Sequence, residues 1–199
     1  MFWFCSRSRR LGWFMLAHHE GHQRWQDLLI ARHPRLFLSG DMQNSIPGYP
    51  LVGDGWRVLV ERAADRISDT LAKGRSGSVT IVQVKEKFGT ARIYWTGTGL
   101  TKAAEDAIAN AVALAEARSG CTCETCGREG VLRQIGGQLL TACAEHANNG
   151  APVPVHAGWE NIHLVRGTRD GKSAILACRR YDRASDFFVD VDPASLGIE

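Results

Sequence analysis

Residues 121–127 read CTCETCG, and residues 143–146 read CAEH. A Cys-x-x-Cys turn places two thiolates within reach of one metal ion, and a second pair of ligands further along the chain completes a tetrahedral set. Four protein ligands leave no position open for water, so the pattern predicts a metal that stabilises folding. We therefore expect one structural zinc ion (Zn2+) bound by four side chains: Cys123, Cys126, Cys143 and His146.

The cysteines are distributed as in a metal site. Four of the six fall within residues 121–143, beside a histidine, whereas a disulfide framework would spread them along the chain. This clustering indicates a reducing cytoplasm, where thiolates are available to metal. Cys121 either replaces one thiol of the first pair or takes no part. We favour the second interpretation, because Cys123 and Cys126 already complete a standard turn, with Gly127 where a left-handed residue is wanted.

Helices are predicted before this cluster. Residues 20–33 predict a short helix that ends at Pro34, because proline disfavours helical geometry in the residue before it. Residues 40–53 predict a loop. The clearest helical pattern covers residues 56–71, where apolar side chains recur three and four positions apart. Asp54 is expected to cap the start of this helix.

A β-hairpin and a second long helix follow. Residues 79–84 and 91–95 are rich in β-branched and aromatic side chains, and residues 85–90 connect them. Residues 101–119 are rich in alanine, with apolar side chains at helical spacing.

Three further strands are predicted beyond the cysteine cluster, at residues 160–166, 172–181 and 186–191. A three-stranded meander is only marginally stable alone, so we expect it to pack on the main body. The predicted fold is therefore α+β, with helices and a β-hairpin packed with a zinc-ribbon-like module, plus a C-terminal three-stranded β-meander. The expected parts are an N-terminal extension at 1–19, an α+β domain at 20–146 with its zinc ribbon at 121–146, a linker at 147–154 and a β-meander tail at 155–199.

Charge and hydropathy restrict the function classes. The net charge is +3, and residues 1–50 hold six arginines against three acidic residues, so the rest of the chain is close to neutral. This distribution disfavours a non-specific polyanion binder. No run reaches the roughly 18 to 20 apolar residues that a membrane span needs. The N-terminus lacks the order of a secretory signal, and translation from Met15 is an alternative start. We expect a cytoplasmic protein with no membrane partner.

Four motifs in order resemble a family of uncharacterised small zinc-binding proteins of tailed phages and prophages. The resemblance covers about residues 25–146 and implies a phage or prophage protein that acts inside a bacterial host cell. It maps the CExCG motif onto Cys123 and Cys126, and it brings no established activity. Ala91 departs from the family, in which a bulkier leucine is expected. The motifs are GDGW at 53–56, QVKEKFGTARIYW at 83–95, AEARSGCTCETCGREG at 115–130 and LLTACAEH at 139–146.

The hairpin turn carries the candidate binding residues. Lys85, Lys87 and Phe88 lie in or next to the turn, and Arg92 and Tyr94 follow on the next strand. Ammonium groups beside aromatic rings suit an acidic partner or a phosphate backbone. The alternative is a solvated turn whose phenylalanine folds back onto the core.

No pattern of catalytic residues is found. The histidines of residues 18–22 lack the zincin spacing, and no nucleophile elbow, Walker loop or dinucleotide fingerprint is present. We therefore predict that the protein is not an enzyme and has no small-molecule substrate. A metal-dependent enzyme would need an open coordination position.

Two kinds of macromolecular partner fit the sequence. The first hypothesis is an adaptor or inhibitor that binds a host or phage protein through its hairpin and zinc-knuckle surface. The alternative is a nucleic-acid-binding regulator, whose basic surface adds Arg128 and Arg133 to Lys85, Lys87 and Arg92. The alternative predicts binding that weakens steeply with salt.

Overall fold

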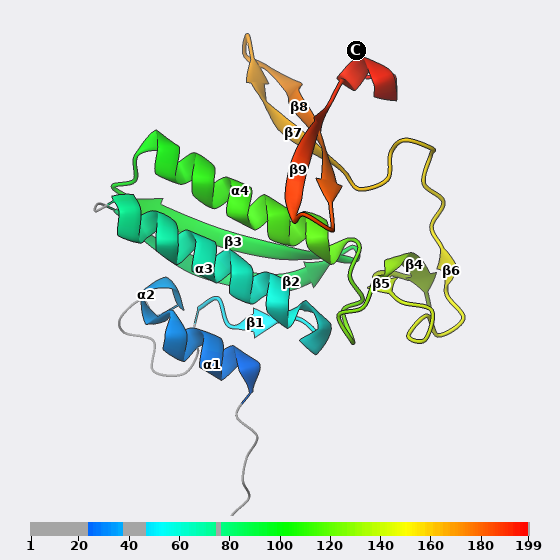
Figure 1. Cartoon of the computed structure of the whole chain (residues 1–199), viewed down its shortest axis with the longest axis horizontal. Coiled ribbons are helices and arrows are strands. Elements are labelled where there is room, and N and C mark those ends of the chain that lie inside the picture. Colours follow the sequence, from blue (N-terminus) through cyan, green and yellow to red (C-terminus); the bar gives the residue numbers. More distant parts are fainter. Residues whose placement is uncertain (1–23, 38–46, 75–76, 199) are drawn as a thin grey trace, which may run out of the picture.

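The first part of the chain forms a sheet covered by helices on one face (Figure 1). The structure is a computed structural model that describes residues 24–37, 47–74 and 77–198. Strands β2 (Ser78–Lys87) and β3 (Thr90–Thr98) form a long antiparallel hairpin. Helices α3 (Arg57–Gly74) and α4 (Lys102–Ser119) lie side by side over this hairpin. The predicted α+β fold, its hairpin and its two long helices are confirmed.

The core lies between the helices and the inner face of the hairpin. Val79 and Ile81 point inward with the strict alternation of a strand, and Val84 is also fully buried. Val84 lies three positions after Ile81 and still faces the core, because a β-bulge between Ile81 and Gln83 inserts one extra residue into β2. On the helical side, Trp56 is completely buried, as expected of a core anchor. Among the described residues, no helix is long and apolar enough to cross a membrane.

The N-terminal helices differ from the prediction. Helix α1 covers Trp25–Arg32, and Pro34 begins a second short helix, α2 (Pro34–Phe37), instead of ending helical structure. Proline fits the first turn of a helix because its missing N–H is not needed there. The predicted start of α1 at residues 20–23 and the extension at 1–19 lie outside the described residues.

Two predictions for residues 47–56 were wrong, and the predicted loop at 40–46 lies outside the described residues. Pro50–Leu51 forms strand β1, which pairs in parallel with β2. Asp54 does not cap α3 but opens a 3-10 helix, η1 (Asp54–Trp56), and its carboxylate accepts a hydrogen bond of 2.9 Å from Trp25 Nε1. Asp54 thus joins α1 to the start of α3.

The cysteine and histidine residues lie in a second, small sheet. We call residues 121–152 the Cys–His module. Strands β4 (Val131–Ile135) and β5 (Gln138–Ala142) form its hairpin, and β6 (Ala151–Pro152) pairs with the other edge of β4. Strand β6 falls within the segment that the sequence predicts to be a linker.

The C-terminal residues form the predicted three-stranded meander. Its strands are β7 (Ile162–Arg169), β8 (Lys172–Asp182) and β9 (Phe187–Val191), and a 3-10 helix, η2 (Pro193–Leu196), follows. Tyr181 and Phe188 pack against Leu114, Ala117 and Cys121 at the end of α4. The meander therefore packs on the main body, as expected for a sheet of this size.

Candidate metal centre

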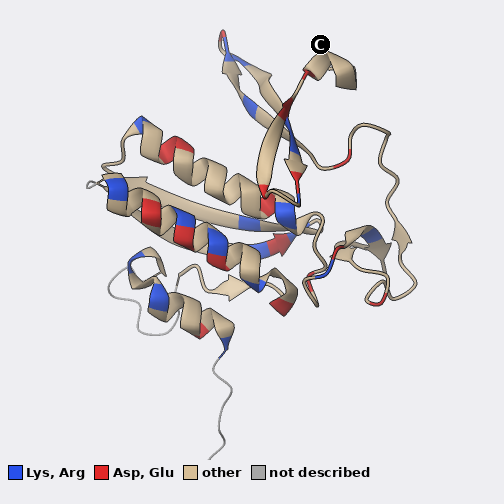
Figure 2. Cartoon of the chain, in the orientation of Figure 1, with Lys and Arg blue, Asp and Glu red and all other residues tan. Residues whose placement is uncertain are grey.

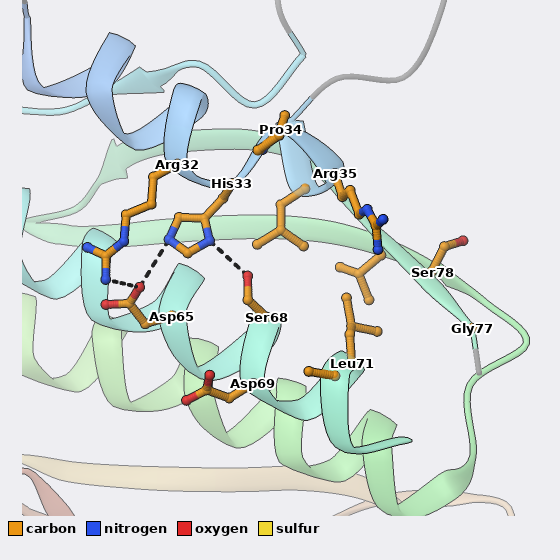
Figure 3. Close-up of a pocket in the computed structure, with 13 residues that line it drawn as sticks. Arg32, His33, Pro34, Arg35, Asp65, Ser68, Asp69, Leu71, Gly77 and Ser78 are labelled. Atoms are coloured by element: carbon orange, nitrogen blue, oxygen red, sulfur yellow. Dashed lines mark hydrogen bonds and ion pairs between the residues drawn. The ribbon is translucent and has the colours of Figure 1, made fainter. Parts of the chain in front are cut away.

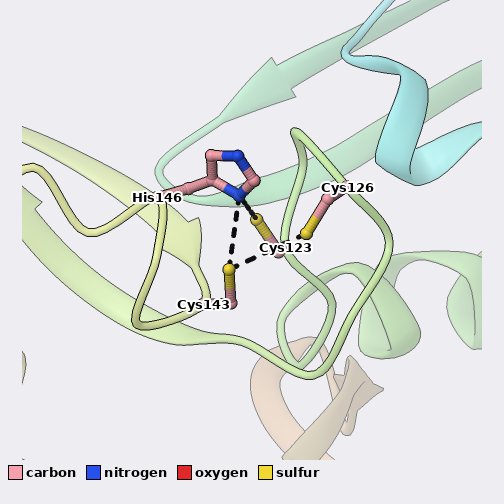
Figure 4. A group of neighbouring side chains, drawn as sticks. All are labelled: Cys123, Cys126, Cys143 and His146. Atoms are coloured by element: carbon pink, nitrogen blue, oxygen red, sulfur yellow. Dashed lines mark hydrogen bonds between the residues drawn. The ribbon is translucent and has the colours of Figure 1, made fainter.

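Four side chains of the Cys–His module lie close together (Figure 4). Their potential ligand atoms all lie within 4.8 Å of one another. Cys126 Sγ is 3.7 Å from Cys143 Sγ, and His146 Nδ1 is 3.6 Å from Cys123 Sγ and 3.3 Å from Cys143 Sγ. These are the four residues that the sequence predicts, and they could bind one metal ion.

The first pair of ligands sits on a tight turn. The amide of Cys123 donates to Arg128 O at 2.8 Å, and the amide of Gly127 donates to Cys123 O at 2.9 Å. Gly127 has a φ of 75°, so the left-handed residue expected after the second cysteine is present. The second pair follows strand β5, where Cys143 and His146 lie in the next turn. Two turns separated by a hairpin thus face one another.

The GDGW segment supports the first turn. Gly53 N donates to Glu124 Oε1 at 3.0 Å, and Gly55 N donates to Glu124 O at 2.8 Å. The buried indole of Trp56 donates to Thr122 O at 2.7 Å. This role of Glu124 was not predicted from the sequence, although its position in the CExCG motif was a signal.

Substitution of Gly55 by alanine is expected to separate the Cys–His module from α3. A Cβ atom at Gly55 would lie 2.2 Å from Cys123 O and 2.4 Å from Gly127 N, both backbone atoms that carry the turn. We expect a loss of about 2 to 3 kcal/mol in the free energy of unfolding. Denaturant unfolding measures it. Gly74→Ala is the control, because a Cβ there meets nothing within 4 Å, and an equal loss in both variants would refute the explanation.

The pKa values of Cys123 and Cys126 are lowered, so these two thiols ionise more readily and would attract a cation between them. A hydrogen bond from Arg128 lowers the pKa of Cys126 to about 6. Burial alone would raise the pKa of Cys123, but backbone amides that donate to its sulfur hold that pKa below its ordinary value. Burial raises the pKa of Cys143. The neighbouring sulfurs of Cys123 and Cys126 raise the pKa of His146, because they stabilise its protonated ring. A metal ion would supply the same positive charge and displace the remaining protons.

Arg128 links the cluster to a carboxylate. Its Nε donates to Cys126 Sγ at 3.4 Å, and another nitrogen donates to Cys143 Sγ at 3.8 Å. The same guanidinium forms a two-nitrogen ion pair with Glu145. Arg128 therefore offsets the negative charge of the sulfurs and joins the two turns.

Cys121 lies outside the group of four. Its thiol is buried and donates to Arg118 O at 3.3 Å, and burial raises its pKa. Cys121 is not among the four side chains whose ligand atoms lie within 4.8 Å of one another. This position matches the interpretation that Cys121 takes no part in the metal site.

The hairpin tip rests on the Cys–His module. Thr141 Oγ1 of β5 donates to Gly89 O at 2.6 Å in a buried hydrogen bond. Phe88 precedes this contact with a φ of 54° and is 66% exposed. The alternative in which Phe88 folds back onto the core is therefore wrong.

The structure groups the other candidate binding residues near this tip. Lys85 pairs with Arg92 across the hairpin, and Tyr94 lies on the same, outer face. The Lys85 ammonium is 5.5 Å from the centre of the Tyr94 ring, and the Lys87 ammonium is 5.4 Å from that of Phe88.

Three of the predicted basic residues have internal partners. Arg92 forms an ion pair with Glu116 of α4. Arg133 donates to the carbonyl oxygens of Ala142 at 3.2 Å and Gly150 at 3.0 Å. Arg128 is paired with Glu145. By contrast, the ammonium groups of Lys85 and Lys87 lie next to aromatic rings.

A cavity of about 890 Å³ lies between α2, α3 and the start of β2 (Figure 3). His33 borders it, with Nδ1 2.8 Å from Ser68 Oγ and Nε2 3.0 Å from Asp65 Oδ1. Ser68 lies inside α3, where the backbone N–H groups are used in helical hydrogen bonds, so no amide is free to stabilise an oxyanion. We interpret the three side chains as a clamp that holds α1 and α2 against α3.

The fold and the site define an α+β protein with a group of three cysteines and one histidine able to bind a metal ion. Comparison of the chain with protein-family models, curated proteins and solved structures gives no match.

Proposed function

We propose that the Cys–His module is a zinc ribbon that binds one structural zinc ion. Two thiolates bound to one zinc ion at about 2.3 Å stand about 3.8 Å apart in a tetrahedron. The distance of 3.7 Å between Cys126 Sγ and Cys143 Sγ supports this geometry. Three sulfurs and one imidazole are also a common ligand set for structural zinc. With four protein ligands, the ion stabilises the module and carries no reacting water.

We further propose that the protein is a non-enzymatic phage or prophage adaptor or inhibitor that binds a host or phage protein through the hairpin tip. The conformation of Phe88 carries this proposal. A bulky residue with positive φ is strained, and such strain is concentrated at functional sites. The positive φ of Phe88 directs its ring outward, and the contact between Gly89 and Thr141 holds the hairpin tip in place.

The chemistry of the tip favours an acidic protein surface with an apolar pocket. Phe88 offers an exposed aromatic ring, and aromatic side chains dominate protein-binding hot spots. Lys85 and Lys87 add two ammonium groups beside the exposed rings. Acidic residues around a pocket for the ring would complement both features.

The proposal is tested by affinity purification from the bacterial host with quantitative mass spectrometry. We expect a protein that is enriched with the wild type and lost with Phe88→Ala. The matched control is Val58→Ala, which removes an exposed apolar side chain (51% exposed) from α3. A protein retained equally by both variants would not bind through the tip, and the proposal would then be wrong.

Phe88→Asn is expected to stabilise the protein while it weakens partner binding. Asparagine tolerates positive φ much better than phenylalanine, so relief of the strain adds about 1 kcal/mol to the free energy of unfolding. Denaturant unfolding and the affinity purification above measure the two effects. A loss of stability would mean that the ring contributes to the fold, and the functional explanation of its strain would fail.

Nucleic acid is the second candidate partner, favoured by the ammonium groups of Lys85 and Lys87 next to aromatic rings. It predicts bound nucleic acid in the same purification. It also predicts an affinity that falls steeply with salt and is reduced in Lys85→Ala. Binding that does not change with salt would exclude it.

A further inference from the structure

Three arginines surround a single carboxylate where the C-terminal sheet meets the helices. Arg62 and Arg66 approach Oδ2 of Asp186 at 3.1 and 2.7 Å. Arg118 Nη1 lies 3.2 Å from Oδ1, to which the Tyr181 hydroxyl donates at 2.6 Å. Each oxygen of Asp186 thus accepts two hydrogen bonds, which uses the full acceptor capacity of a carboxylate.

The arginines retain unused donors. Arg62 and Arg66 each place one nitrogen on Asp186, although a guanidinium offers five N–H groups. Among the described residues, neither side chain has another hydrogen-bond or ion-pair partner. Their side chains are 45% and 33% exposed, one turn apart on α3, so the remaining donors are accessible from solvent.

The cluster has an excess of positive charge. Three guanidinium groups and one carboxylate give a net charge of +2. Figure 2 shows the basic residues on α3 and at the end of α4, which faces the turn between β8 and β9. Arg183 in that turn follows Asp182, so this pair leaves the excess unchanged, and the buried Nε of Arg183 has no hydrogen-bond partner among the described residues. Like charges so close repel one another, and a bound anion would remove the repulsion.

We propose that Arg62 and Arg66, with Arg118 behind them, bind the dianion of a phosphate monoester. Guanidinium groups match the oxygens of phosphate in two-point hydrogen bonds. A phosphate monoester carries a charge of about −1.5 to −2 at pH 7, which balances the excess of the cluster. A carboxylate or a phosphodiester carries only one negative charge and leaves part of the excess in place. This site does not depend on the metal or on the hairpin tip.

Calorimetric titration of the full chain with inorganic phosphate tests the proposal. We expect saturable binding below about 10 mM, and binding at least about tenfold weaker in Arg66→Gln, which loses one charge-assisted contact. Arg57→Gln is the matched control, because Arg57 lies on the same helix but pairs with Glu61. An equal loss of phosphate affinity in both variants would overturn the site. A titration with sodium chloride that gives the same heat signal as phosphate at equal ionic strength would also overturn it.

A measurement on the unmodified protein avoids any effect of the substitution on folding. Phosphate is expected to shift the Nε–H signals of Arg62 and Arg66 in nuclear magnetic resonance spectra, and not that of Arg57. Absence of a selective shift would refute the site. The dissociation constants of phosphoserine and adenosine monophosphate then distinguish the source of the phosphate group. Tighter binding of phosphoserine indicates a phosphorylated protein, and tighter binding of adenosine monophosphate indicates a nucleotide.

Discussion

Replacement of Cys126 by serine is expected to release the metal ion and unfold the Cys–His module. Structural zinc contributes about 10 to 16 kcal/mol of apparent binding free energy, which is also folding free energy. The apolar core of the module is small, since its buried cluster consists of Cys123, Ala142 and Cys143, with Ile135 beside them. Metal content measured by mass spectrometry should fall from one ion per chain to none. Far-UV circular dichroism should lose strand signal.

The effect of Cys126→Ser should reach the helical layer, because the GDGW segment is hydrogen-bonded to the first turn of the module. We expect a lower melting temperature for the whole chain, and the same result after chelation of the wild type. Cys121→Ser is the control, and its cost should be below about 1 kcal/mol since its thiol lies outside the cluster. A Cys126→Ser protein that keeps its metal and stability would contradict the structural role.

Asp186→Asn is expected to detach the C-terminal sheet. The substitution leaves Arg62, Arg66 and Arg118 without their shared carboxylate in a site where Asp186 is only 12% exposed. Loss of the hydrogen bonds to this charged group costs about 1.5 to 3 kcal/mol, and the solvent exposure of Arg62 and Arg66 keeps the cost within that range. Denaturant unfolding measures the cost, and limited proteolysis should cut within β7–β9 in the variant first.

Asp190→Asn separates this effect from a general loss of charge. Asp190 lies on the same sheet, is 88% exposed and pairs with Arg179 at 3.4 Å, so its replacement should cost less than about 1 kcal/mol. Equal costs for the two variants would contradict the role of Asp186.

Acid should abolish the difference between Asp186→Asn and the wild type. Burial alone would raise the pKa of Asp186, but hydrogen bonds from Tyr181 and Arg66 hold it below its ordinary value. The carboxylate therefore stabilises the fold fully above the ordinary pKa of about 3.9. That contribution is lost as the pH falls through the lowered pKa of the folded state.

Local patterns in the sequence predicted the features that depend on local chemistry. Apolar periodicity located α3 and α4, and Cys-x-x-Cys spacing identified side chains that lie together and could bind a metal ion, because both patterns depend on residues a few positions apart. Strand β1 was missed because its two residues become a strand only by pairing with Val84 and Lys85. The role of Asp186 was missed for the same reason, since Arg62 lies 124 positions away.

Phe88 shows a different limit of sequence analysis. An aromatic residue in a hairpin turn can fold onto the core or point to solvent, and composition alone does not distinguish the two. The connection between β2 and β3 consists of Phe88 and Gly89, both with positive φ. Such a short turn leaves the ring no path back to the buried face, so backbone geometry decides its exposure.

The contact between Trp56 and Thr122 sets an order of events during synthesis. The two residues are 66 positions apart, and the buried indole of Trp56 finds its acceptor only in the Cys–His module. When the ribosome has released α4, the helical layer still contains a buried N–H group without a partner. The last of the four clustered side chains, His146, emerges later still. Completion of the helical core therefore coincides with assembly of the Cys–His module, at a late stage of synthesis.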